Sequence, residues 1–447
     1  MLNTVLLIPI WMVYLASFWI FVRRRQLSMR LGLNLGIMHM VLVPLTLFAV
    51  QGDLPGEPAV MIPAVDWDQH GAAILRILVM VGMYGVVDFV CHMLPSDPPS
   101  PPRTGPDLWS SLPKLRPIHL IIAFLFGAIT LFVVTGVASG GHWADAKSEF
   151  LLSGGTPALL VYNLFIAVRL ATLIALAAMY LHDKVTLKWI LLCLGLLCAV
   201  DLYTSGNRIF TLQALVVIAA LLLVRGKWLQ FGLLGLATLP LGALMTMFPL
   251  IRVYMHRWTG GFALSTATTA LGEGYMEAKD FFGAGLGIPE FIIGVTEGIN
   301  INVLIVVVED FHRSLGMLMG TGILRGFVFW VPRSIWPGKP QNLSVLIGQH
   351  LLGGSERGVS MGATIFGEFW ANFGLLGFAA IPVLIFIIDR ALKKLIKDPT
   401  MRMVAAFIYG YSIVRMPISD FTVLFIFVIV LLNLTRLQRK ANELPAQ

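Results

Sequence analysis

The chain of 447 residues has few charged side chains and almost no cysteine. Asp, Glu, Lys and Arg make up 13% of the sequence, whereas apolar residues make up 57%. All three cysteines, Cys91, Cys193 and Cys198, fall in apolar segments, where we expect them to pack as small side chains. The sequence therefore offers neither a disulfide framework nor a zinc site.

Several catalytic signatures are also missing. The sequence has no GxxxxGK[ST] phosphate loop, no GxGxxG after a predicted strand and no HExxH pair. An enzyme that uses a soluble nucleotide sugar needs a folded phosphate-binding surface, yet the largest connection predicted on the cytoplasmic side is the Pro-rich segment 95–117. An activated substrate must therefore reach the protein already attached to a lipid.

Long apolar runs dominate what is present. Most of them approach the roughly 20 residues that an α-helix needs to cross a bilayer core, and a helix satisfies its own backbone polar groups without water. The runs lie at 3–22, 31–50, 72–93, 117–138, 157–180, 187–203, 209–224, 228–250, 365–389, 403–415 and 421–436. The sequence thus predicts an all-α, polytopic helical membrane protein with eleven transmembrane helices.

Basic residues indicate the orientation, because Lys and Arg near the ends of spans are retained in the cytoplasm. The first connection contains Arg23, Arg24, Arg25 and Arg30. The opposite loop, 51–71, contains four acidic residues and no Lys or Arg. This asymmetry places the amino terminus outside and the carboxyl terminus in the cytoplasm.

The longest segment outside the predicted spans, 251–364, carries eight Lys/Arg and eight Asp/Glu. We expect it to form a large outer loop between helices 1–8 (1–250) and helices 9–11 with a cytoplasmic tail (365–447). Within the loop, 291–308 and 315–331 are apolar but interrupted by polar residues. They are therefore expected to be interfacial or re-entrant helices rather than spans.

Several arginines lie where a guanidinium is costly or faces the outer side. Arg169 falls near the middle of the fifth span, where a buried charge costs roughly 2.5–3.5 kcal/mol on insertion scales. At or near the outer side lie Arg76, Arg208, Arg252, Arg257, Arg333 and Arg415. A guanidinium binds phosphate oxygens through two parallel hydrogen bonds, so a group of them favours a diphosphate headgroup. Snorkelling, or a structural ion pair for Arg169, is the alternative.

Candidate acids and bases accompany these arginines. Glu368 and Asn372 lie four residues apart at the start of the ninth span, on one face of the helix. Glu368 is either an ion-pair partner or a general base. Further candidates for a base are Asp420, Asp310 and His312. Asp66 and Asp68, in the first outer loop, are either a solvated turn or a base or site for Mg or Mn.

With these residues in view, the chain resembles the Wzy-type O-antigen and enterobacterial-common-antigen polymerases of oligosaccharide repeat units. The resemblance rests on five elements in the second half of the chain. They are SGNRIF (205–210), IRVYMHRW (251–258), PRSIWPGKP (332–340), GEFWANFG (367–374) and RMPISDF (415–421). The first half of the chain contributes only its hydropathy pattern to the resemblance.

The resemblance implies a GT-C-like glycosyltransferase in the bacterial inner membrane, with a periplasmic amino terminus. Such an enzyme moves a growing glycan from undecaprenyl diphosphate to the next lipid-linked repeat unit on the periplasmic face. Its partners would be the lipid-linked donor and acceptor oligosaccharides, membrane lipid and a chain-length-regulating co-polymerase. The resemblance calls for no nucleic acid, cofactor or metal.

On this hypothesis the leaving diphosphate needs cations that are already in place. The residues expected to act in catalysis are Arg208, Arg252, Arg333 and Glu368. Those expected to bind substrate are Arg169, Arg257, Lys339, Arg415, Asp420 and His312. Two alternatives stay open: an O-antigen ligase, which shares the donor but uses another acceptor, and a flippase that moves lipid-linked oligosaccharide without chemistry.

Overall fold

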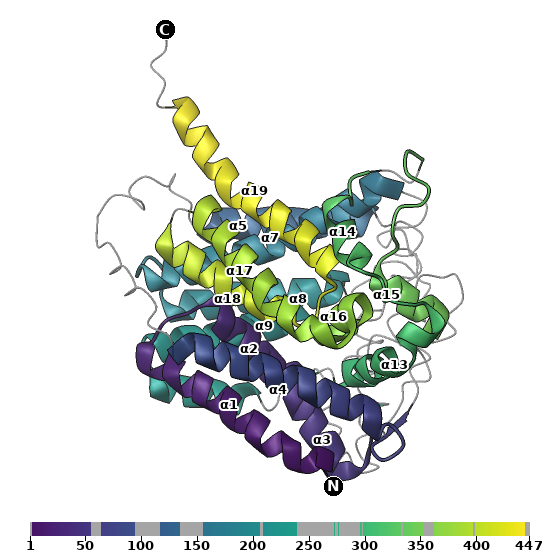
Figure 1. Ribbon diagram of the computed structural model, residues 1–447. Coiled ribbons are helices and arrows are strands. Elements are labelled where there is room, and N and C mark those ends of the chain that lie inside the picture. The colour runs from purple at the N-terminus through teal and green to yellow at the C-terminus, as the bar shows by residue number, and fades with distance from the viewer. Residues whose placement is uncertain are drawn as a thin grey trace. The chain divides into compact units, whose positions relative to one another are not determined.

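The computed structural model of the protein is almost entirely helical. It describes residues 2–54, 64–93, 117–134, 155–205, 209–238, 272, 276, 296, 298–331, 334–351, 362–396 and 398–442. Figure 1 shows its helices coloured along the chain. The contacts group the chain into two compact units. The first consists of Met1–Arg103 and Thr296–Phe425, and the second of Thr104–Val295 and Ile426–Gln447. Each unit thus joins segments that are far apart in the sequence.

Among the described residues, five helices are long and apolar enough to cross a membrane. They are Asn3–Arg24, Met29–Gln51, Gly71–Cys91, Val161–Leu181 and Thr364–Leu395, and each coincides with a predicted span. Shorter apolar helices lie at Leu187–Val200, Ile209–Val224, Trp228–Thr238 and Ile418–Leu432. An all-α, membrane-embedded protein is therefore confirmed, while the count of eleven spans and the GT-C-like arrangement stay predictions.

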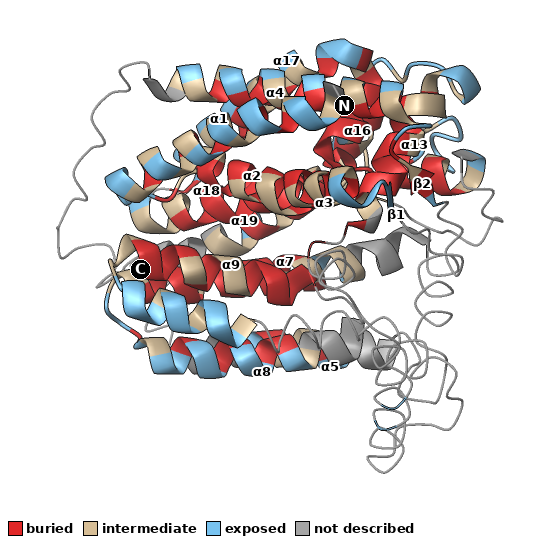
Figure 2. Ribbon diagram, turned by 90° about the horizontal axis from the view of Figure 1, so that it is seen from below, coloured by how far each residue is buried: buried red, intermediate tan, exposed pale blue. Residues whose placement is uncertain are grey.

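The first unit begins with three predicted spans. Its elements up to residue 93 are α1 (Leu2–Arg24), α2 (Met29–Ile37), the π-helical turn η1 (Met38–Leu42), α3 (Val43–Gln51), the antiparallel strands β1 (Asp53–Leu54) and β2 (Val65–Asp66), and α4 (Gly71–Met93). Asn3 donates a hydrogen bond to the carbonyl oxygen of Gly71, so α1 and α4 start at the same end. Figure 2 shows these two helices side by side.

Helix α18 (Pro399–Ile413) crosses α2 at glycines. A Cβ atom on Gly32 would overlap the carbonyl oxygen of Phe407, and one on Gly410 would overlap that of Met29. Neither position has room for a methyl group, so the two backbones are in direct contact. Small residues allow this close approach between helices in membranes, where packing and hydrogen bonds drive association.

A buried polar cluster joins α2 to α4. The Nδ2 atom of Asn34 donates to Asp88 at 2.8 Å, and the Nε atom of Arg30 lies 3.7 Å from the other carboxylate oxygen. Asn34 and Asp88 are both buried, while Arg30 is partly exposed. The cluster therefore fixes the register between the two helices from inside the first unit.

We expect Asp88→Ala to lower the thermal unfolding midpoint in detergent, because the Asn34 amide would stay buried without its acceptor. An unsatisfied buried polar group costs about 1–3 kcal/mol. Asp183→Ala is the matched control, since Asp183 is exposed and pairs with Arg225 at 2.8 Å. An exposed pair of that kind contributes about 0–1 kcal/mol. Equal midpoints for the two variants would contradict this role of Asp88.

The other helices of the first unit enclose α13 (Ile299–Ser314). This helix packs on α4, α16 (Thr364–Phe373) and the π-helical turn η4 (Ile347–Leu351). Its apolar side chains are buried all round, and Figure 2 shows α13 and α16 as largely buried. Residues 291–295 and 297 lie outside the described residues, so a re-entrant or interfacial placement of 291–308 stays a prediction.

The ninth predicted span is interrupted near its start. Helix α16 ends at Phe373, the 3₁₀ turn η5 (Gly374–Leu376) follows, and α17 continues over Gly377–Leu395. Gly374 has a φ of 58°, a conformation that glycine adopts without the penalty of a side chain. One continuous helix was expected from the apolar run 365–389, and the glycine is the physical reason for the difference.

The carbonyl groups at the end of α16 find partners outside the helix, as helix ends in a buried setting require. The carbonyl oxygen of Ala371 accepts from the Leu318 amide at 3.0 Å, and that of Asn372 accepts from the Met319 amide at 3.1 Å. The loop between α13 and α14 (Thr321–Phe327) thus closes the break in the span.

The second unit has its own packed helices. They are α5 (Pro117–Val134), α7 (Gly155–Leu181), α8 (Leu187–Ser205) and α9 (Ile209–Val224). Helix α5 packs on α7 and α8, and α9 packs on the same two helices. The Phe124 ring contacts the rings of Phe165 and Phe210, which gives this unit an aromatic centre. The last helix, α19 (Ile418–Asn442), starts in the first unit, and its residues from Ile426 belong to the second.

Candidate functional site

Six of the ten predicted site residues lie within the described part of the chain. Arg208, Arg252, Arg257 and Arg333 lie outside it, so their roles stay predictions. Arg169 belongs to the second unit. The first unit contains His312, Lys339, Glu368, Arg415 and Asp420.

Arg169 is buried among aromatic rings of the second unit. Its guanidinium carbon lies 5.5 Å from the centroid of the Phe165 ring and 5.6 Å from that of the Phe210 ring. The negative faces of aromatic rings attract a cation, which offsets part of the cost of burying it. This setting accounts for part of that cost without a ligand, and a headgroup-binding role for Arg169 stays a prediction.

Two carboxylates and one guanidinium of the first unit interact electrostatically, from α14, α16 and the start of α19. The charges of Asp420 and Arg325 both act on the Glu368 carboxyl group, and the charge of Arg325 also acts on Asp420. We call Glu368, Asp420 and Arg325 the acid–arginine cluster. It lies inside a single compact unit, so its geometry does not depend on the placement of the second.

Glu368 is the buried member of the cluster. It is 2% exposed, and its Oε1 atom makes no hydrogen bond to any described residue. A Cβ atom on Gly322 of α14 would lie 3.3 Å from this oxygen, so the backbone of α14 runs directly beside it. Buried polar atoms are nearly always hydrogen-bonded, because leaving one unpaired is costly. Several buried polar atoms of the described residues lack a hydrogen bond, and the Glu368 oxygen is the one among them that belongs to a carboxyl group.

Asn372 fixes α14 against α16. It is fully buried, its Nδ2 atom donates to the Glu368 carbonyl oxygen at 2.7 Å, and its Oδ1 atom accepts from the Gly322 amide at 3.3 Å. Glu368 and Asn372 lie on one face of α16, as expected, and this face is buried. The amide of Asn372 is occupied on both sides, whereas the Glu368 carboxyl group is not.

Asp420, in the first turn of α19, is held by hydrogen bonds. Its Oδ1 atom accepts from Asn342 at 2.9 Å and from the Ser419 hydroxyl at 3.4 Å. Asn342 also caps α15 (Leu343–Leu346) by accepting from the Ser344 amide at 3.2 Å. Of the two acids, Glu368 is therefore the one better placed to accept a proton from a substrate.

Arg325 is the member of the cluster that was not predicted as a site residue. In the sequence it is one of the polar residues that interrupt the apolar stretch 315–331. The structure places its Nη1 atom 3.3 Å from the Pro340 carbonyl oxygen, to which it donates. The neighbouring sequence GILRG (322–326) holds the signal that could have found it. Glycines four residues apart allow a helix to pack closely, and a cation beside them then enters the interface.

The two other predicted cations of the first unit have different surroundings. The ammonium group of Lys339 donates to the carbonyl oxygens of Phe329 at 2.8 Å and Val331 at 2.9 Å, so it stabilises the turn that follows α14. Arg415 lies in the turn between α18 and α19, and its backbone amide donates to Ser412 at 3.2 Å. Phosphate binding by either residue stays a prediction.

His312 caps the interrupted span. Its Nε2 atom lies 2.8 Å from the Trp370 carbonyl oxygen, and its ring stacks on the Trp370 ring at 5.2 Å between centroids. A carbonyl only accepts, so Nε2 carries the hydrogen. The guanidinium of Arg76 lies 5.8 Å from the same Trp370 ring. Asp310, another candidate base, lies 4.0 Å from Arg313 on the same helix, where both side chains are exposed.

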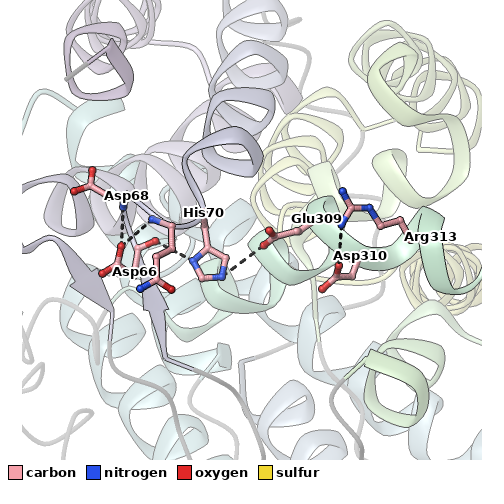
Figure 3. Close-up of polar contacts among 7 residues, drawn as sticks. Asp66, Asp68, His70, Glu309, Asp310 and Arg313 are labelled. Atoms are coloured by element: carbon pink, nitrogen blue, oxygen red, sulfur yellow. Dashed lines mark hydrogen bonds and ion pairs between the residues drawn. The ribbon is translucent and has the colours of Figure 1, made fainter.

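A second polar group connects the segment 66–70 to α13 (Figure 3). The Oδ1 atom of Asp66 accepts from the amides of Asp68 and Gln69, both at 2.9 Å. The His70 ring lies 2.9 Å from the Asp66 carbonyl oxygen through Nδ1 and 3.5 Å from a Glu309 oxygen through Nε2. Asp66 therefore shapes a turn. Within the described ranges, no three His, Cys, Asp or Glu side chains are grouped so that they could hold a metal ion.

Comparison with family models, curated proteins and solved structures finds no match to this chain. The geometry of the acid–arginine cluster is therefore the basis on which a function is assigned.

Proposed function

We propose that the protein is a membrane glycosyltransferase that polymerises polyprenyl-diphosphate-linked oligosaccharide repeat units on the outer face of a bacterial inner membrane. One observation supports it most: a buried carboxyl group, Glu368, has an oxygen with no hydrogen bond to the described residues and is within the electrostatic influence of Arg325 and Asp420. A reaction that removes a proton from a sugar hydroxyl needs such a group.

The cluster lies near the end of the first unit that holds the predicted outer connections. The Ile365 amide, at the start of α16, donates to the Val414 carbonyl oxygen at 2.8 Å, just after the end of α18. Arg76, near the start of α4, lies over Trp370, which is two residues after Glu368. The distribution of Lys and Arg predicts that these helix ends face outward. A lipid-linked substrate on the outer face would therefore approach this end.

The reaction can be written for these residues. The hydroxyl oxygen of the acceptor sugar attacks the anomeric carbon of the donor glycan, and its proton passes to the Glu368 carboxylate. As the new carbon–oxygen bond forms, the bond between the anomeric carbon and the diphosphate oxygen breaks, and the lipid diphosphate leaves with the electron pair. Cations in place before the reaction stabilise that charge. The candidates are Arg208, Arg252, Arg257, Arg333, Lys339 and Arg415.

The test is to incubate purified protein in lipid with a polyprenyl-diphosphate oligosaccharide of one repeat unit. We expect a ladder of products that differ by whole repeat units, together with released lipid diphosphate. A single capped product that forms only with a core-lipid acceptor would instead indicate a ligase. Movement across a vesicle without a change in mass would indicate a flippase. A substrate that stays unchanged would overturn the proposal.

A further inference from the structure

Helix α14 covers the Glu368 carboxylate. At Gly322 its backbone contacts α16. A Cβ atom added to Gly322 would lie 3.1 Å from the side-chain Nδ2 atom of Asn372. At Gly326 it contacts α19, where an added Cβ atom would lie 2.9 Å from the Cβ atom of Thr422. Glu368 is 2% exposed beneath this helix. A substrate hydroxyl therefore reaches the carboxylate only after α14 has moved.

The sequence and surroundings of α14 suit a helix that can move. It has seven residues and follows two glycines with positive φ, Gly316 at 73° and Gly320 at 86°. Its outward side chains Leu324 and Phe327 are 45% and 60% exposed. Short elements that bury few side chains open at lower free energy than a packed core. In a membrane, the exposed apolar side chains would face lipid, from which a lipid-linked substrate comes.

Arg325 is the charged residue on the covered side of α14. Its charge acts on Glu368 of α16 and on Asp420 of α19, and the charge of Asp420 also acts on Glu368. Two carboxylates close together repel, so a nearby cation favours the state in which both are ionised. The guanidinium therefore attracts α14 to both acids.

We infer that Arg325 is a positioning residue of the Glu368 site, which holds α14 over the Glu368 carboxyl group until a lipid-linked acceptor displaces the helix. The part that concerns the acceptor rests on the proposed function. The part that concerns Arg325 and Glu368 does not, and it can be tested without a substrate.

Dicyclohexylcarbodiimide, an apolar reagent that modifies protonated carboxyl groups, provides that test. The carboxyl proton passes to a nitrogen of the carbodiimide, and the carboxyl oxygen bonds to its central carbon. The resulting O-acylisourea rearranges to a stable N-acylurea, which peptide mass spectrometry detects. The full chain in lipid vesicles is treated with the reagent, and the fraction of Glu368 that carries the adduct is followed over time.

We expect Arg325→Gln to raise the rate of labelling at Glu368 roughly fivefold to tenfold, because the carboxylate loses both its cover and its nearby positive charge. Arg325→Lys, which keeps the charge, should label nearly as slowly as the wild type. Arg313→Gln is the matched control, since Arg313 lies near an acid on α13 but is 78% exposed. Glu368→Gln should remove the adduct and so verifies the labelled site.

Equal labelling in the wild type, Arg325→Gln and Arg313→Gln would overturn the inference. An equal rise in Arg325→Gln and Arg325→Lys would also overturn it, because the charge would then have no part in holding α14. In the elongation assay, Arg325→Lys should keep most of the activity that Arg325→Gln loses. A wild type that forms no ladder but shows the expected order of labelling would remove the proposed function and leave the role of Arg325 intact.

Discussion

Glu368→Gln is expected to abolish chain elongation by the purified protein while leaving the fold intact. The glutamine side chain has nearly the same shape and fits the buried position beside Gly322, but it cannot accept a proton from the acceptor hydroxyl. A positioned general base contributes about 10²–10⁴-fold to a rate. The measurement is the initial rate at which the one-repeat substrate is converted to longer products.

The control for this prediction is the same substitution at another carboxylate of the first unit. Glu309→Gln removes the acid that faces His70 at 3.5 Å, on α13 and away from the acid–arginine cluster. We expect this variant to elongate glycan at a rate close to that of the wild type. If Glu368→Gln is as fast as Glu309→Gln, Glu368 is not the base and the proposed chemistry has to be abandoned.

Gly410→Ala is expected to prevent the first unit from folding. A Cβ atom at this position would overlap the Met29 carbonyl oxygen and lie 2.9 Å from the Leu33 amide nitrogen, both of which are backbone atoms of α2. Inserting a methyl group into a well-packed interface typically costs about 1–3 kcal/mol. The cost here should exceed that range, because two helix backbones must separate and no side chain can turn away. Gly32→Ala should act in the same way from α2.

The yield of monodisperse protein in detergent and its thermal unfolding midpoint measure this effect. Gly195→Ala is the control, because Gly195 is in α8 and an added Cβ atom there would meet nothing within 4 Å. That substitution should be neutral or stabilise the helix by about 0.5–1 kcal/mol. If Gly410→Ala and Gly195→Ala give the same yield and midpoint, α2 and α18 do not approach as closely as described.

The spans could be predicted from the sequence because length and apolar content decide whether a helix crosses a membrane. All five helices that are long enough coincide with predicted apolar runs. The break between α16 and α17 could not be predicted. It depends on one glycine, Gly374, and on the backbone amides of Leu318 and Met319. These amides donate to the last carbonyl groups of α16 only in the folded unit.

Part of the candidate site could also be predicted from the sequence. The shared face of Glu368 and Asn372 follows from the helical period alone. Arg325 was missed because its two acids lie on other helices, far along the chain, and only tertiary packing brings them together. The contacts of Lys339, whose ammonium group donates to two backbone carbonyls of the preceding turn, are a local geometry that composition does not reveal.

A cryo-EM map of the full chain with a bound polyprenyl-diphosphate oligosaccharide would test the role of Glu368 most directly. We expect a sugar hydroxyl within hydrogen-bonding distance of the Glu368 carboxylate and guanidinium groups around the diphosphate. We also expect α14 to have moved, so that Gly322 no longer contacts Asn372. A glycan bound elsewhere, with α14 still closed over Glu368, would contradict the assignment of this carboxylate as the base.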